Sequence, residues 1–204
     1  MHSVTTSSLA LALLLSAGVA SAQQETDRVV MPSASDWTKP QPSADVQVQG
    51  GVQGATGGLG AATVVGPSAQ VRVAYGIFQW LSIGANYGIA GQGAERSMGD
   101  ATVVTQAFFG DVRATAPFGL FRPYAFGGIG YGWNRVRSDA STPLAHTDNP
   151  LLPVGVGLNF MVSKAVAVGP QASYTQTLSS SRHDPINGGN YWNAGLSATY
   201  QMQL

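Results

Sequence analysis

Three charged residues stand apart in a chain that is otherwise poor in charge. Arg72, Asp111 and Arg113 lie in segments where apolar residues alternate with small or polar ones. Removing one partner from a buried ion pair can cost about 3–5 kcal/mol, so a carboxylate facing two guanidinium groups would be strongly constrained. We therefore predict an interior ionic network of these three residues. It would act either as a plug that holds the structure closed or as a gate.

Two segments combine a histidine with hydroxyl and carboxyl side chains, His146–Asp148 and Ser181–Asp184. A nucleophile and its base must lie about 2.6–3.2 Å apart in a fixed geometry. Both segments fall where the pattern predicts surface loops, which do not hold such a geometry. We therefore expect no catalytic residues and no enzymatic activity.

The composition argues against several other kinds of site. The chain has no cysteine, which excludes disulfides, thiolate metal sites and a cysteine nucleophile. Its histidines show no paired ligand spacing on a rigid element. Ten basic and ten acidic residues give a formal net charge of zero, unlike the basic face that binds nucleic acid. We expect no metal, no cofactor and no nucleic-acid partner.

The low content of charged residues and the dispersed apolar residues predict which kind of secondary structure positions Arg72, Asp111 and Arg113. Hydrophobic residues make up 44% of the chain and charged residues 10%, against a usual charged share of about 25%. Beyond the N-terminal region, no apolar run approaches the roughly 20 residues of a spanning helix. The composition instead suits membrane β-strands, in which every second residue faces lipid.

The N-terminal region has the pattern of an export signal. The run from Leu9 to Ala20 is apolar but too short to span a bilayer, and Ala20-Ser21-Ala22 offers a small-residue cleavage site. We predict a signal peptide over residues 1–22. A flexible periplasmic leader rich in Pro and Ser would follow over residues 23–44.

Alternation of apolar and polar residues predicts eight strands over residues 45–204. Their expected ranges are 45–53, 69–78, 81–90, 101–116, 124–135, 152–160, 166–175 and 192–204. In the second strand Val71, Val73 and Tyr75 share one face and Arg72 lies on the other. The fifth strand is rich in glycine, and the pattern favours Ile129 on its outer face.

The connections alternate between long and short. Long loops are expected at 55–67, 91–100, 137–150 (the longest) and 179–190, and short ones at 79–80, 117–123 and 163–164. A barrel with an even number of strands and both termini in the periplasm has long outer loops and short inner turns. The sequence therefore predicts a closed, eight-stranded antiparallel transmembrane β-barrel with up-and-down meander topology.

Aromatic residues fall into two groups along the predicted strands. Trp80, Phe118, Phe121, Phe160 and Tyr200 lie near the short turns and the C-terminus. Tyr87, Tyr131, Trp133, Tyr174 and Trp192 lie toward the long loops. Membrane barrels carry an aromatic girdle at each interface with the headgroups. We predict that these residues form two such girdles.

Two segments, Gly119–Tyr131 and Val154–Phe160, resemble strand–turn–strand segments of small outer-membrane barrels. This family is typified by outer membrane protein A and its barrel-only relatives, and the resemblance covers residues 45–204. It implies location in the cell outer membrane, with outer-membrane lipids and the barrel assembly machinery as partners. The chain ends in Leu204, where the last strand of this family usually ends in Phe.

Three classes of function remain open. The interior of an eight-stranded barrel is just wide enough to be filled by side chains. We therefore expect a structural or surface-interaction barrel with a filled lumen, whose long loops are available to an extracellular partner. The first alternative is a small passive solute channel. The second is a soluble lipocalin-like barrel, which would place its apolar face inside around a ligand.

Overall fold

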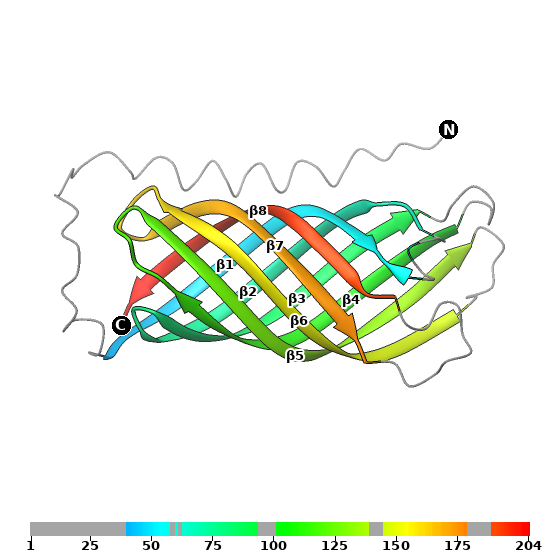
Figure 1. Ribbon diagram of the computed structural model, residues 1–204, viewed down its shortest axis with the longest axis horizontal. Coiled ribbons are helices and arrows are strands. Elements are labelled where there is room, and N and C mark those ends of the chain that lie inside the picture. Colours follow the sequence, from blue (N-terminus) through cyan, green and yellow to red (C-terminus); the bar gives the residue numbers. More distant parts are fainter. Residues whose placement is uncertain (1–39, 58–59, 61–62, 94–100, 139–144, 179–188) are drawn as a thin grey trace. The chain divides into compact units, whose positions relative to one another are not determined.

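The computed structural model describes residues 40–57, 60, 63–93, 101–138, 145–178 and 189–204. In these ranges eight strands form one closed barrel (Figure 1). They are β1 (Pro40–Ala55), β2 (Gly66–Phe78), β3 (Leu81–Gly93), β4 (Ala101–Thr115), β5 (Phe121–Ser138), β6 (Ala145–Met161), β7 (Val166–Thr177) and β8 (Tyr191–Gln203). Among the residues that the structure describes, no helix is long and apolar enough to cross a membrane.

Each strand pairs antiparallel with its neighbour in sequence, and β1 pairs with β8 to close the ring. Because the ring is closed, each of the eight strands has a hydrogen-bonding partner on both edges. Its backbone N–H and C=O groups are therefore paired within the barrel, as a membrane requires. The predicted eight-stranded antiparallel meander is therefore confirmed.

Alternate residues of each strand face the outside and the lumen, as the period of two requires. In β2, Val71 and Val73 are 45% and 57% exposed, whereas Arg72 between them is 2% exposed. In β5, Ile129 is 67% exposed and Tyr124 only 4%. The predicted faces of both strands, including the glycine-rich fifth, are confirmed.

Several strands extend beyond the expected ends, and three of the extensions matter most. The first strand begins at Pro40 rather than near Asp45. β5 and β6 continue to Ser138 and from Ala145, so the connection at 139–144 is not the longest. His146 therefore pairs with Arg135 within the sheet, and the prediction of a surface loop at 146–148 is wrong. Backbone pairing explains the extension, because antiparallel neighbours supply each other's hydrogen-bonding partners.

The two ends of the barrel differ in their connections. The connections at 79–80, 116–120 and 162–165 lie at one end, which we call the short-turn end. β1 begins and β8 ends there too, since Pro40 pairs with Phe78 and Ser43 with Gln203 (Figure 1). The connections at 56–65, 94–100, 139–144 and 178–190 lie at the long-loop end. The predicted sorting of long and short connections is confirmed.

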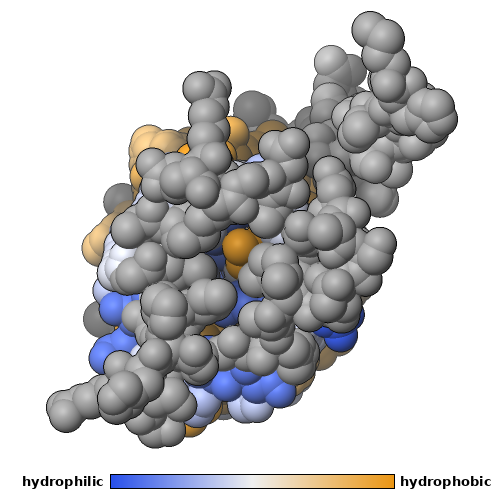
Figure 2. Space-filling model, turned by 90° about the vertical axis from the view of Figure 1, so that its right-hand side faces the viewer, coloured by the Kyte–Doolittle hydropathy of each residue, from blue (hydrophilic) through white to orange (hydrophobic). Residues whose placement is uncertain are grey.

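Apolar residues lie mainly on the outer face of the barrel wall, and polar residues lie mainly on its inner face. Figure 2 shows the long-loop end, where hydrophobic residues reach the rim at the upper left, hydrophilic residues lie along the lower edge, and a hydrophobic residue shows between hydrophilic ones at the centre. Most large exposed residues are valine, isoleucine, leucine or aromatic, whereas buried polar residues face the lumen. An apolar outside and a polar inside are the pattern of a membrane barrel and the reverse of a lipocalin.

Candidate functional site

The lumen brings Arg72 of β2 and Asp111 of β4 into a buried ion pair across β3. Arg72 Nε lies 3.0 Å from both carboxylate oxygens of Asp111, and their side chains are 2% and 1% exposed. A second guanidinium nitrogen of Arg72 donates to Ser82 Oγ at 3.2 Å. Gly84 lies beneath the pair: a Cβ there would stand 2.8 Å from Asp111 Oδ1 and 2.9 Å from Arg72 Cζ. The absent side chain leaves the space that the pair fills.

Arg113 shares the lumen with this pair but has different partners. One of its terminal nitrogens donates to Gln47 Oε1 at 2.7 Å. Its guanidinium carbon lies 4.2 Å from the centre of the Tyr124 ring and 5.6 Å from that of Phe126. This geometry is a cation–π contact, which is worth more in a desolvated interior than at a surface. The predicted three-residue network is therefore an ion pair beside a separately held arginine.

A chain of side-chain hydrogen bonds runs across the lumen from Gln47. Gln47 Nε2 of β1 donates to Gln171 Oε1 of β7 at 3.2 Å, and Tyr124 Oη donates to the same oxygen at 2.8 Å. Gln171 Nε2 donates to Gln49 Oε1 at 2.7 Å, and Gln49 Nε2 donates to Asn193 Oδ1 at 2.7 Å. Side chains from β1, β4, β5, β7 and β8 are thus joined through the middle of the barrel.

Two glycines of β6 make room for the aromatic rings of β5. Gly157 pairs with Tyr124 and Gly155 with Phe126. A Cβ at Gly157 would lie 2.3 Å from Tyr124 Cζ, and one at Gly155 would lie 2.5 Å from Phe126 Cζ. The rings therefore lie flat along the inner wall, where Tyr124 reaches both Arg113 and Gln171.

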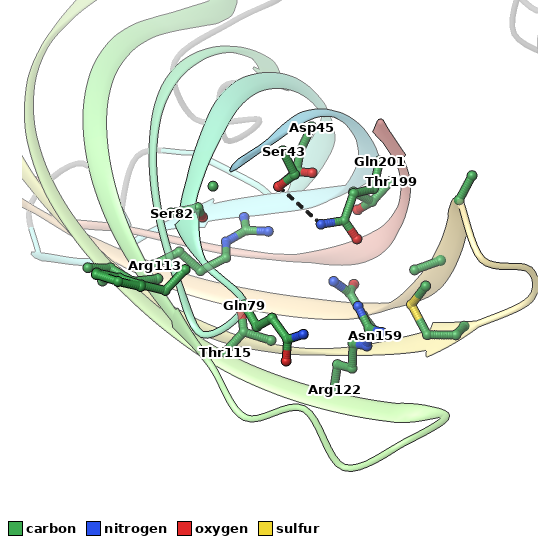
Figure 3. Close-up of a pocket in the computed structure, with 16 residues that line it drawn as sticks. Ser43, Asp45, Gln79, Ser82, Arg113, Thr115, Arg122, Asn159, Thr199 and Gln201 are labelled. Atoms are coloured by element: carbon green, nitrogen blue, oxygen red, sulfur yellow. Dashed lines mark hydrogen bonds between the residues drawn. The ribbon is translucent and has the colours of Figure 1, made fainter. Parts of the chain in front are cut away.

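A cavity of about 60 Å³ lies at the short-turn end of the lumen, and we call it the short-turn cavity. Figure 3 shows Arg113 and Arg122 approaching it from β4 and β5, with Ser43 and Asp45 of β1 on another side. Gln201 of β8 also lines it and donates to Ser43 Oγ at 3.2 Å. This cavity therefore combines two guanidinium groups, one carboxylate and several neutral polar groups.

A second cavity, of about 40 Å³, lies at the long-loop end of the lumen. We call it the long-loop cavity. Gln53, Asn134, Asn149 and Tyr191 line it together with threonines and apolar side chains, and none of the described residues that line it is charged. Asn134 Nδ2 donates to Tyr191 Oη at 2.7 Å. Among the described residues, the two cavities have no lining residue in common.

Sequence reasoning missed several residues of the lumen. It assigned no role to Asp45 or Arg122, which lie close to strand ends where the alternation is weak. It also missed the inward rings of Tyr124 and Phe126. The signal that could have indicated the rings is the pair of glycines in the neighbouring strand, because an inner ring needs a partner without a side chain.

The aromatic residues predicted to form girdles lie on the outer wall or at its turns. Trp80, Phe118, Phe121, Phe160, Tyr200, Tyr87, Tyr131 and Tyr174 are 37–53% exposed. Trp133 and Trp192 are half-buried. Trp192 lies over Gly54, where a Cβ would be 2.5 Å from its ring, and Trp133 Nε1 donates to Gln106 Oε1 at 2.6 Å. Their contact with a membrane interface stays a prediction.

The remaining candidates for chemistry add no site in the described part of the chain. Residues 181–184 lie outside the described residues, and the side chain of His146 does too. Within the described ranges, no group of three or more His, Cys, Asp or Glu side chains could hold a metal ion.

Comparisons with known proteins agree on one architecture. Residues 8–202 match a family model described as an outer membrane protein β-barrel domain. Neisserial surface protein A has a similar structure, with a TM-score of 0.64, 14% identity, and coverage of 77% of this chain and 96% of that one. The N-terminal barrel domain of Pseudomonas aeruginosa OprF has a TM-score of 0.57 and 13% identity. The match covers 80% of this chain and 100% of that one.

The attachment invasion locus protein of Yersinia pestis, in complex with a heparin analogue, is a third similar structure. Its TM-score is 0.53 at 13% identity, with 79% of this chain and 99% of that chain covered. A comparison with curated protein sequences found no significant match. At these identities the solved structures show a shared fold.

Proposed function

Because this chain belongs to the outer-membrane β-barrel family, we propose that it serves that membrane as a structural or surface-interaction barrel whose lumen is plugged by side chains. The exposed valine, leucine, isoleucine and aromatic residues of its outer wall suit contact with lipid. We also propose that it is not an enzyme.

The observation that supports a plugged lumen is a hydrogen-bonded layer of side chains in the middle of the barrel, which we call the central layer. Gln47, Tyr124 and Gln171 meet there from three strands, and Arg113 joins them from a fourth. The cavities on either side of this layer have no lining residue in common in the described ranges. An eight-stranded barrel is narrow enough for such a layer to close it.

The proposed orientation places the short-turn end and both termini of the mature chain in the periplasm, after removal of a signal peptide. Short inner turns and longer outer loops are the usual arrangement of these barrels. The long-loop end would then face outward and meet an extracellular partner, while lipids and the barrel assembly machinery contact the wall. The attachment invasion locus protein, whose name refers to attachment, shares this fold.

A small passive channel is the second candidate. It is favoured by the two cavities, which bring polar space close to the central layer from both ends. A rearrangement of only that layer would then join them. Ion conductance separates the two candidates, because a closed layer blocks ions and a rearranging one passes them.

The test is conductance of the refolded protein in planar bilayers. We expect the natural protein to conduct little or no current. A double variant, Tyr124→Ala with Gln171→Ala, removes two side chains of the central layer and is expected to conduct. Val168→Ala on the exposed face of β7 is the matched control and is expected to stay silent. Steady conductance of the natural protein at the level of the double variant would overturn the plug.

A further inference from the structure

Several polar side-chain atoms that line the short-turn cavity have no hydrogen-bond partner. In the described part of the chain, ten buried side-chain nitrogen or oxygen atoms lack a hydrogen-bond partner. Five of them belong to residues that line this one cavity: Asp45 Oδ1, Arg113 Nε, Arg122 Nε, Asn159 Oδ1 and Thr199 Oγ1. A buried polar group that is left without a partner destabilises the structure. Together these atoms call for a polar occupant.

The charges that line the cavity indicate the sign of that occupant. Arg72 and Asp111 neutralise each other in their own ion pair. Among the described residues that line the cavity, Arg113, which is 4% exposed, and Arg122 are accompanied by one acidic group, the carboxylate of Asp45. A guanidinium group presents five N–H donors in a planar fork that matches phosphate and carboxylate oxygens. The surplus of positive charge therefore favours an anion.

Asp45 narrows the choice of anion. An ionised carboxylate accepts hydrogen bonds and donates none, so Asp45 Oδ1 needs a donor from the occupant. Sulfate and phosphodiesters have no O–H group at neutral pH and would be repelled by Asp45. Inorganic phosphate keeps at least one O–H group, which can donate to Asp45 while its other oxygens accept from the arginines.

The size of the cavity is consistent with such an ion. One water-sized group needs roughly 10–15 Å³ of cavity volume, and this cavity has a volume of about 60 Å³. That is room for the four oxygens of phosphate. Figure 3 shows the guanidinium groups and Asp45 around the same space, on strands β4, β5 and β1.

We propose that the short-turn cavity binds inorganic phosphate in its protonated form. Arg113 and Arg122 would hold the phosphate oxygens, and Asp45 would accept the hydrogen bond of the phosphate O–H group. The site shares Arg113 with the central layer but otherwise lies on its short-turn side, and phosphate binding is measured separately from conductance.

The experiment is a titration of the refolded full chain with inorganic phosphate in a phosphate-free detergent at constant ionic strength, followed by calorimetry. We expect saturable binding of one phosphate per chain. Sulfate is expected to bind at least about tenfold more weakly, since tenfold corresponds to about 1.4 kcal/mol, close to one hydrogen bond to a charged group. Dimethyl phosphate, which stands for a lipid phosphodiester, is expected not to displace phosphate.

Three variants locate the site. Arg122→Gln is expected to weaken phosphate binding by about tenfold or more. Asp45→Asn replaces a repelling carboxylate by an amide that can donate, so sulfate should bind it nearly as well as phosphate does. Arg135→Gln removes an exposed arginine of the same strand as Arg122 and should leave binding unchanged. A heat-dependent gel shift shows that each variant is folded.

Several results would overturn the proposal. Absence of saturable phosphate binding would mean that water alone occupies the cavity. Equal binding of sulfate and phosphate by the natural protein would remove the role of Asp45. Equal loss of affinity in Arg122→Gln and Arg135→Gln would place the binding elsewhere. None of these results depends on the conductance of the barrel.

Discussion

The two halves of the lumen bury different kinds of polar group, charged ones toward the short-turn end and neutral ones toward the long-loop end. The half toward the short-turn end contains Arg72, Asp111 and Arg113, which are held by an ion pair, a cation–π contact and hydrogen bonds. The half toward the long-loop end relies on neutral groups such as Asn134 and Tyr191. Buried charges are costly to leave unpaired and neutral groups less so. The short-turn half should therefore be much more sensitive to substitution.

The largest expected effect comes from breaking the ion pair. Arg72→Ala or Asp111→Ala leaves one uncompensated charge in the lumen and should lower the free energy of unfolding by about 3–5 kcal/mol. Urea unfolding of the folded barrel in lipid vesicles measures the change. Arg135→Ala, which removes an exposed arginine, is the matched control and should cost about 0.5 kcal/mol or less. Equal losses for Arg72 and Arg135 would mean that the buried ion pair stabilises the barrel no more than an exposed arginine does.

A smaller effect is expected from filling the space beneath the pair. Gly84→Ala adds a Cβ that would crowd Asp111 and Arg72, and overpacking of this kind costs about 1–3 kcal/mol. Gly50→Ala is the matched control, because a Cβ there has no neighbour within 4 Å. The same unfolding measurement compares the two. If both variants were equally stable, the pair would not depend on the missing side chain of Gly84.

The smallest effect is expected in the long-loop half. Tyr191→Phe removes the oxygen that accepts from Asn134 and should cost about 0.5–1.5 kcal/mol. Tyr75→Phe, on the exposed outer wall, should be close to neutral. A loss at Tyr191 as large as that at Arg72 would show that neutral and charged halves are equally constrained, contrary to the comparison.

The faces of the strands could be predicted because they depend on a local property. Successive side chains of a strand point to opposite sides, so the alternation around Arg72 placed it in the lumen before any partner was known. The same reasoning placed Asp111 and Arg113 on the inner face of one strand. The glycine-rich fifth strand followed the rule as well, with Ile129 outward.

The ends of strands were harder to predict because pairing, not alternation, decides where they stop. The segment His146–Asp148 has no clear alternation, yet it forms strand because Arg135 and its neighbours on β5 are available as partners. The loop boundary at 137–150 was therefore wrong, while the number of strands was right.

The number of strands, the sorting of the connections and the inward faces of Arg72, Asp111 and Arg113 could be predicted from the sequence, because each depends on a period of two or on loop length. Which inward residues meet depends on the folded barrel. Asp111 pairs with Arg72 rather than with Arg113, and Arg113 donates to Gln47, which lies 66 residues away in the sequence. Closure of the barrel, with its fixed tilt and stagger, sets those distances across the lumen, and no local pattern contains them.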